Sequence, residues 1–333
     1  MTAPRLTIDE AAATLAAGGL VAFGTETVYG LGANATDPEA VAKIYAAKRR
    51  PAFDPLIVHL ADGADLHTDL HTDLHIVRAR AIEVVARWTP RQVSLAAAFW
   101  PGPLTMLAPR GRSIPELVTS GLPDVAVRVP GTPAARELIA KAGVPIAAPS
   151  ANLFGRISPT TVEHVLDQLG DAIDGVVDTG PCGVGVESTV IRVPDDDGPL
   201  VVLRLGGTSL EALAEVAGEV VMAVDEDRAE LQAETSPGRL PSHYAPRVPL
   251  RVVERAMPSR DEGLLAWRQP VAGFAAVEVL SESGDDVEAA ARLFAAMRRL
   301  EASGVRAIQA ERVPSDGLGR AINDRLARAS HAG

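Results

Sequence analysis

The sequence predicts an α/β protein with two domains, and three observations support this prediction. The chain of 333 residues is long enough for about two domains that each bury a core, and 47% of its residues are hydrophobic. Short apolar strand patterns alternate with helical patterns along the chain. A polar stretch, residues 223–246, separates residues 1–222 from residues 247–333. We therefore expect a large domain, a linker and a small domain.

The first helix and strand are expected near the start of the chain. Thr7 and Glu10 have the spacing of a capping box, and Gly18 and Gly19 provide a helix stop. The apolar residues 20–23 then predict a buried strand that enters a glycine-rich loop.

A second helix is expected to begin after Asp37, an N-cap residue, and to end in a cluster of cations. Its last turn holds Lys48, Arg49 and Arg50, where positive charge interacts favourably with the helix dipole. Such a placement needs no ligand. In a chain of formal net charge −11, the cluster is also a candidate site for an anion.

Two predicted strands each carry one polar side chain among apolar ones. In residues 56–60, His59 shares a face with Ile57, and a histidine there is more often a hydrogen-bonded core residue than a catalytic one. In residues 124–130, Arg128 lies on the face opposite three valines and needs solvent or an anionic partner.

Three further segments combine strands with polar loops. Residues 144–165 predict a strand, a loop and a helix with Ser158 as its N-cap, a place that could also bind an anion. Residues 180–193 form a glycine-rich loop before a strand, but the glycine spacing is too loose for a nucleotide-binding fingerprint. Arg204 lies near a strand end, and Thr208 is expected to cap the next helix.

The last part of the chain predicts a small α/β domain that is compatible with a parallel sheet. The end of the linker before it is rich in proline, is expected to be semi-rigid, and contains His243 and Tyr244. The expected elements are strands at residues 250–254, 271–279 and 306–311 and helices at residues 286–303 and 318–329.

Composition disfavours several classes of protein. A single cysteine, Cys182, rules out an internal disulfide and a cysteine-based zinc site. No run of about 18 apolar residues predicts a membrane span. Asp9 and Glu10 stand where a signal peptide would carry cations, so we expect a cytoplasmic protein. The net charge of −11 and the aromatic content of 4% disfavour broad RNA or DNA binding.

The tetrapeptide Asp-Leu-His-Thr recurs in residues 65–76 and places His67, His71 and His75 four residues apart. On a helix these imidazoles would share a face and could bind a metal. Nothing nearby would orient such ligands, so we favour a lengthened surface connection and predict no metal ligands.

The remaining polar positions are hydroxyls, amides and cations, with no nucleophile–base–orienter triad and no P-loop. Such residues suit a reaction in which the protein positions polyanions and neutralises their charge, as in phosphoryl or nucleotidyl transfer.

Seven segments of the first part, in order, resemble a known family. They read GGLVAFGTETVYGLGA, YAAKRRPAFDPLIVH, FWPGPLTML, VAVRVP, PIAAPSAN, SPTT and GVESTV, and together they resemble the YrdC-like threonylcarbamoyl-AMP synthases. The SPG and HYAP of the linker and GLGRAINDRL at residues 317–326 resemble the long, two-domain form. The resemblance implies a YrdC-like twisted mixed sheet with flanking helices, a linker that closes over the active site, and a smaller Rossmann-like α/β domain.

The resemblance also implies an activity. L-threonine, bicarbonate or CO₂, and ATP would give threonylcarbamoyl-AMP and pyrophosphate for the threonylcarbamoyladenosine modification of tRNA, and the product would pass to the transfer machinery. Mg²⁺ is expected with ATP. The alternative is an RNA-binding module of the same fold, although direct tRNA binding is expected to be weak or absent. A hydrogenase-maturation carbamoyltransferase with this domain would need a zinc finger, which a single cysteine excludes.

Site residues follow from the resemblance by position. It implies that Lys48 and Arg50 are catalytic cations that hold the triphosphate. The threonine-binding residues would be Thr27, His59, Arg128 and Ser188. The ATP-binding residues would be Arg50, Asp54, Asp124, Ser150, Asn152, Ser158, Arg204 and Tyr244.

Several positions depart from the family pattern. Gly24 replaces a proline, Arg49 a glycine, Asp54 an asparagine and Asp124 a threonine, and the RLPS of residues 239–242 is unusual. A carboxylate near a polyphosphate is unfavourable unless a cation lies between them. We therefore expect Asp54 to face Arg49 or Mg²⁺ rather than phosphate.

Overall fold

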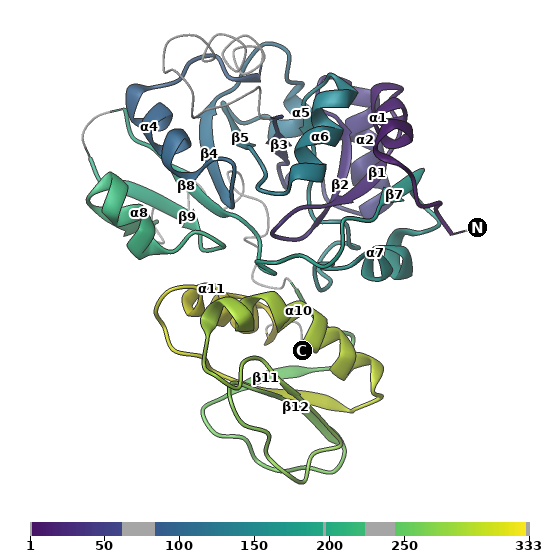
Figure 1. Ribbon diagram of the computed structural model, residues 1–333, viewed down its shortest axis with the longest axis vertical. Helices are drawn as coiled ribbons and strands as arrows, with labels where there is room; N and C mark the ends of the chain where they lie inside the picture. The colour runs from purple at the N-terminus through teal and green to yellow at the C-terminus, as the bar shows by residue number, and fades with distance from the viewer. Residues whose placement is uncertain (1, 62–83, 196–197, 224–243, 331–333) are drawn as a thin grey trace.

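A computed structural model describes residues 2–61, 84–195, 198–223 and 244–330 of the chain. Figure 1 shows a larger body built from the N-terminal part of the chain and a smaller body built from the C-terminal part. The larger body contains a ten-stranded sheet and the smaller one a four-stranded sheet. The described residues contain no helix that is long and apolar enough to span a bilayer.

The large sheet is mixed, as predicted. Its strand order is β10-β9-β8-β4-β5-β3-β6-β2-β1-β7, and both parallel and antiparallel pairs occur in it. The strands are β1 (Val21–Gly24), β2 (Tyr29–Asn34), β3 (Ile57–His59), β4 (Leu104–Pro109), β5 (Asp124–Arg128), β6 (Ile146–Ala147), β7 (Gly175–Val177), β8 (Thr189–Arg192), β9 (Leu200–Arg204) and β10 (Val220–Met222).

Helices flank this sheet, and several begin at the predicted caps. Thr7 forms a capping box with Glu10, and the Asp37 carboxylate accepts hydrogen bonds from the backbone at the start of the second helix. The helices are α1 (Ile8–Ala16), α2 (Pro38–Lys48), α4 (Pro90–Phe99), α5 (Glu116–Thr119), α6 (Pro133–Ala142), α7 (Val162–Leu169) and α8 (Leu210–Ala217).

Two predicted caps are wrong. Thr161 rather than Ser158 caps α7, because the Ser158 hydroxyl donates to the carboxylate of Glu187 instead. Ser209 rather than Thr208 caps α8, because the backbone N–H and carbonyl of Thr208 are both hydrogen-bonded to the Thr189 hydroxyl.

The alternation of β3 and β5 decides where the polar side chains point. Val58 and Val127 face the main core, whereas His59 and Arg128 lie directly opposite each other in the parallel register of the two strands. The predicted faces of both strands are therefore confirmed. This register brings an imidazole and a guanidinium together on one face of the sheet.

The small domain has the all-parallel sheet expected of it. Its strand order is β11-β14-β12-β13, and Figure 1 shows both of its helices on the side that faces the large domain. The strand β12 was not predicted, because its short apolar run lacks alternation. The elements are β11 (Leu250–Val253), β12 (Glu262–Ala266), β13 (Ala276–Val279), β14 (Ala307–Glu311), α10 (Asp286–Ala302) and α11 (Gly319–Ser330).

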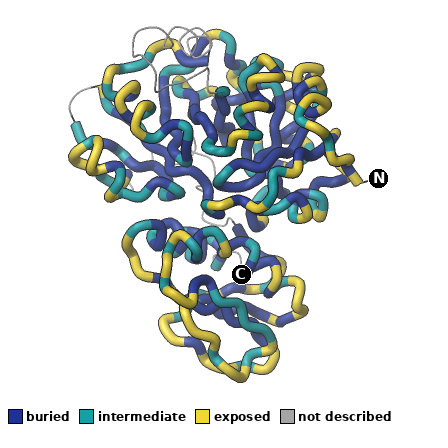
Figure 2. The backbone as a smooth tube through the Cα atoms, viewed as in Figure 1, coloured by how far each residue is buried: buried dark blue, intermediate teal, exposed yellow. Residues whose placement is uncertain are grey.

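The two domains share one hydrophobic cluster. Val28 and Val186 of the large domain pack in it with Phe294 and Leu326 of the small domain. Figure 2 shows buried chain on both sides of the seam between the two bodies. Gly185 has φ of 75°, and a Cβ atom there would lie 2.4 Å from the Cα atom of Ala291. The helix α10 therefore packs directly on the backbone of the large domain.

The C-cap of α2 generates a stability prediction. Arg49 adopts φ of 53°, in the left-handed region where a Cβ atom is unfavourable. We expect Arg49→Gly to raise the free energy of unfolding by about 1 kcal/mol, measured by urea unfolding followed by circular dichroism. Arg49→Ala keeps a Cβ atom and is the control. An equal gain in both variants would show that charge, not backbone strain, is responsible.

Candidate functional site

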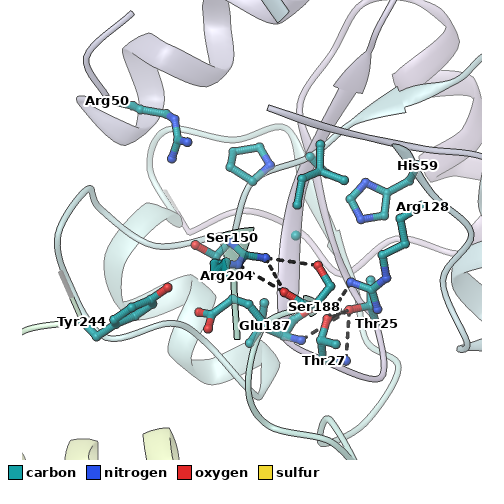
Figure 3. A pocket seen from close by; sticks show the side chains of 15 residues that line it. Thr25, Thr27, Arg50, His59, Arg128, Ser150, Glu187, Ser188, Arg204 and Tyr244 are labelled. Atoms are coloured by element: carbon teal, nitrogen blue, oxygen red, sulfur yellow. Dashed lines mark hydrogen bonds between the residues drawn. The ribbon is translucent and has the colours of Figure 1, made fainter. Parts of the chain in front are cut away.

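A pocket opens on the face of the large sheet where His59 and Arg128 lie, and the end of the linker closes one side of it. Figure 3 shows Arg50 at one end, His59 and Arg128 at the other, and Tyr244 at the side. The lining residues are Thr25, Thr27, Val28, Gly30, Arg50, Ile57, His59, Arg128, Ala148, Pro149, Ser150, Glu187, Ser188, Arg204 and Tyr244.

The Arg128 guanidinium is buried and already has protein partners. Its Nε donates to the carbonyl of Gly102 at 3.0 Å, its Nη1 donates to the Thr27 hydroxyl at 2.9 Å, and its Nη2 contacts the Glu26 carboxylate. The predicted anionic partner is thus Glu26. An arginine has five N–H donors, so each terminal nitrogen keeps one N–H that can reach a ligand. This end of the pocket suits a small carboxylate.

His59 contributes a neutral ring beside this guanidinium. The side chain is 4% exposed, and its Nδ1 has no hydrogen-bond partner among the described residues. Burial, and then the charge of Arg128, lower the pKa of His59 to about 3. The ring nitrogen can therefore accept or donate a hydrogen bond without adding charge to the pocket.

Hydroxyls and a second guanidinium form the floor of the pocket. The Ser188 hydroxyl shares a hydrogen bond of 2.7 Å with Thr105. Arg204 at the end of β9 donates through Nη2 to the carbonyl and the hydroxyl of Ser188, at 2.8 and 3.1 Å. Burial lowers the pKa of Arg204 from its usual value. These contacts fix both side chains before any ligand binds.

At the opposite end, Arg50 forms a buried ion pair. Its Nη2 lies 2.8 Å from the Asp54 carboxylate, and its guanidinium carbon lies 5.8 Å from the centre of the Phe154 ring. Of the two partners expected for Asp54, Arg49 is wrong, because Arg49 is exposed and its neighbour Arg50 makes the contact, whereas Mg²⁺ stays a prediction. One cation of the predicted triphosphate site is therefore shared with a carboxylate.

Lys48 lies behind the pocket rather than in its lining. Its buried ammonium donates to the backbone carbonyls of Ser150 and Asn152, and so holds the loop that carries Ser150. Burial, and then the charge of Arg50, hold the pKa of Lys48 well below its usual value. Asn152 also lies outside the lining, where its amide donates to the carbonyls of Leu153 and Arg156.

Glu187 is a pocket residue that the sequence reasoning did not identify. One of its oxygens accepts a hydrogen bond of 2.6 Å from Ser158, and the other accepts one of 2.9 Å from Arg325 of the small domain. Burial acts to raise the pKa of Glu187, but the charges of Arg325 and Arg204 hold it below its usual value. Tyr244 lies over the Arg325 guanidinium, 5.1 Å from ring centre to carbon.

The structure brings together eight of the predicted residues in the lining: Thr27, Arg50, His59, Arg128, Ser150, Ser188, Arg204 and Tyr244. Asp124 instead lines a separate hollow with Arg192, and burial raises its pKa. The histidines of the Asp-Leu-His-Thr repeat, His243 and the RLPS segment lie outside the described residues.

Glu26 and Glu187 were both within reach of sequence analysis. Each lies inside a motif quoted for the resemblance, next to a hydroxyl residue that was assigned a role. A carboxylate in a short glycine-rich loop beside buried cations signals an ion pair. Arg325 also lies inside a quoted motif, residues 317–326, but its partner Glu187 is 138 residues earlier in the chain, and nothing local indicates that the two meet.

The pocket can bind anions at both ends and neutral polar groups between them. Its guanidiniums are fixed by protein oxygens, and its hydroxyls and imidazole are uncharged donors and acceptors. The hydroxyls of Thr27 and Ser188 accept hydrogen bonds from guanidiniums, which have no lone pair to take a proton and so cannot activate them as nucleophiles. The arrangement suits a reaction between two bound anionic substrates, with the protein supplying position and charge.

Comparisons with known families match almost the whole chain. A protein-family model described as "Telomere recombination" matches residues 13–206. A second, described as "Threonylcarbamoyl-AMP synthase, C-terminal domain", matches residues 208–331.

Named relatives and a solved structure agree with these matches. A threonylcarbamoyl-AMP synthase of Pyrococcus abyssi is 40% identical, over 96% of this chain and 93% of the relative. That of Bacillus subtilis is 39% identical, over 97% of this chain and 92% of the relative. The crystal structure of P. abyssi Sua5 complexed with L-threonine has a TM-score of 0.83 and 36% identity, over 99% of this chain and 97% of that one.

The environment of His59 generates a pH prediction. Its native pKa of about 3 lies below its unfolded value of about 6.5, so the native state binds fewer protons between these values. This contribution to stability is complete above about pH 6.5 and is lost as the pH falls toward 3. By NMR, the Cε1 resonance assigned with His59→Gln should not shift between pH 5 and 8. A titration midpoint near 6.5 would contradict the buried neutral ring.

Proposed function

The chain belongs to the threonylcarbamoyl-AMP synthase family, and from that premise we propose that its pocket joins L-threonine, bicarbonate and ATP into threonylcarbamoyl-AMP and pyrophosphate. The observation that supports this most is the separation of the guanidiniums. Arg128 lies at one end with Thr27 and His59, whereas Arg50 lies at the other. The pocket can therefore hold a small carboxylate and a polyphosphate side by side.

Threonine would lie at the Arg128 end. Its carboxylate would accept the remaining N–H groups of the guanidinium, whose orientation Glu26 and Thr27 already fix. The Nδ1 atom of His59 and the Ser188 hydroxyl would face the amine or hydroxyl of the amino acid. Because the imidazole is neutral, it would not compete with Arg128 for the carboxylate.

In the reaction, bicarbonate would lose hydroxide to give CO₂. The threonine amine would add to CO₂ and lose a proton, which leaves with the hydroxide as water and gives a carbamate. A carbamate oxygen would then attack the α-phosphorus of ATP, and the bond to the β-phosphate oxygen would break to release pyrophosphate. Both reactants are anions, so buried guanidiniums would offset the repulsion between them. Arg50 and Arg204 would serve the nucleotide, with the Ser150 loop held in place by Lys48.

Mg²⁺ would enter with ATP. The described residues contain no group of three His, Cys, Asp or Glu side chains that could hold a metal ion. The carboxylates of Glu187 and Asp54 near the pocket already contact Arg325 and Arg50. Phosphate oxygens and water are therefore its proposed ligands, which is usual for Mg²⁺ bound to a nucleotide.

The product would pass to the machinery that transfers the threonylcarbamoyl group to tRNA, and we propose a cytoplasmic location for both steps. A mixed anhydride with AMP hydrolyses in water, so a pocket closed by Tyr244 would protect it.

A pyrophosphate assay tests the proposal. We expect release of pyrophosphate from ATP and bicarbonate to require L-threonine, without any RNA present, because RNA takes no part in the chemical step. Each of the other standard amino acids in turn provides a control. Release that depends on RNA, or that is equal for all amino acids, would count against the proposal and would favour the RNA-binding alternative.

The Arg50–Asp54 pair generates a second prediction. Asp54→Asn should lower the Kd for ATP by about three- to tenfold, equivalent to about 1 kcal/mol, because Arg50 no longer shares its charge. Isothermal titration at several Mg²⁺ concentrations measures this change in the Kd for ATP. The control is Asp195→Asn, which breaks the exposed pair with Arg87.

Weaker binding by Asp54→Asn would contradict this expectation. If the loss grew as Mg²⁺ rose, Asp54 would be a ligand of the metal. If the loss did not depend on Mg²⁺, the carboxylate would instead be needed to orient Arg50.

A further inference from the structure

The small domain supplies one fully buried guanidinium to the seam beside the pocket. Arg325 of α11 is 0% exposed, although its charge is normally costly to remove from water. Its Nη2 donates to the carbonyl of Leu205 at 2.8 Å, and its Nη1 contacts the carboxylate of Asp324 at 2.7 Å. Its Nε donates to Glu187 at 2.9 Å. Two of these partners belong to the large domain.

Glu187 is the partner that connects Arg325 with the pocket. It lines the pocket with Arg204, and an uncompensated carboxylate there would repel phosphate. Both of its oxygens are engaged, one by Ser158 and one by Arg325. Arg204 is the other cation that faces it, and Tyr244 is the other titratable neighbour.

Tyr244 is the second pocket residue that Arg325 holds. The ring packs on the guanidinium on one side and stacks on Phe294 of α10, with ring centres 5.6 Å apart. Its backbone has φ of 66°, an unfavourable value for a residue with a large side chain. The small domain therefore fixes the conformation of a residue that closes the pocket.

We propose that Arg325 is a positioning residue for the nucleotide, which makes the small domain part of the active site. It binds the Glu187 carboxylate at the seam and offsets its negative charge beside the pocket, and its guanidinium packs on the ring of Tyr244. The proposal rests on the proposed function for the identity of the nucleotide, ATP. Loss of Arg325 would leave Glu187 with Arg204 as its nearest compensating cation, and the pocket would lose positive charge.

The same helix provides a matched control. Arg320 of α11 also forms an ion pair across the seam, with Glu211 of α8, but both side chains are partly exposed and neither lines the pocket. Exposed pairs contribute little to stability, whereas removal of one partner from a buried pair leaves a costly unpaired charge. If Arg325 only held the domains together, Arg325→Met and Arg320→Met would have similar effects on the Kd for ATP.

The experiment measures the Kd for ATP with Mg²⁺ by isothermal titration, in the full-length chain without threonine. The variants are Arg325→Met, Glu187→Gln, the double variant and Arg320→Met. We expect Arg325→Met to weaken ATP binding by about tenfold or more, and Arg320→Met to change it by less than about twofold. The double variant should bind ATP more tightly than Arg325→Met, because it contains no uncompensated carboxylate.

The pH dependence separates this role from a merely structural one. In Arg325→Met, burial without the guanidinium raises the pKa of Glu187, so its charge is lost more readily as the pH falls. The Kd of Arg325→Met for ATP should therefore fall between pH 8 and pH 6 by a larger factor than the Kd of the double variant does. The same comparison between the wild type and Glu187→Gln should show no such change, because Arg325 keeps the carboxylate ionised.

Two results would overturn the proposal. The first is a folded Arg325→Met whose Kd for ATP equals that of Arg320→Met. The second is a double variant whose Kd for ATP is no lower than that of Arg325→Met. If Arg325→Met does not fold, the double variant decides: recovered folding and ATP binding support the proposal, and failure of both overturns it. Wild-type ATP binding without threonine-dependent pyrophosphate release would contradict the proposed function and leave this comparison valid.

Discussion

Every guanidinium around the pocket is held by oxygen atoms of the protein, and the rest of the site depends on this. Removal of a cation from water costs several kcal/mol unless it gains partners. Arg128 gains Glu26 and Thr27, Arg50 gains Asp54, and Arg204 gains Ser188. These contacts set the direction of each charge before a ligand arrives. An acidic chain can thus maintain a pocket that attracts anions.

The large sheet turns this requirement into geometry. Parallel pairing of β3 and β5 places His59 opposite Arg128 on one face of the sheet. The preceding residues, Val58 and Val127, are also opposite each other and face the core on the other side. The pocket is therefore built on strands, whose positions are fixed by backbone hydrogen bonds, and is completed by loops. The loop residues Thr27 and Ser188 each bond to a residue on a strand, Arg128 and Arg204. Little reorganisation is needed for a ligand that fits.

Local patterns in the sequence predicted much of this arrangement. Capping signals at Thr7 and Asp37, and period-two alternation around His59 and Arg128, each depend on residues within a few positions. The long-range pairs could not be found in this way. The contact of Arg325 with Glu187 spans 138 residues, and no local pattern indicates it. Asp54 is a different case, because its partner Arg50 is only four residues away and the turn that ends α2 decides which of two neighbouring arginines it meets. Ser158 has the right type for a helix cap, but the nearby Glu187 took its hydroxyl.

The close contact at Gly185 has a consequence for how ligands are exchanged. The loop backbone and α10 meet with no side chain between them, and the local φ of 75° favours glycine. Two backbones in direct contact have no flexible side chains between them that could change rotamer while one surface slides past the other. A relative motion of the two domains would therefore separate them as rigid bodies at this contact rather than shear them along the seam.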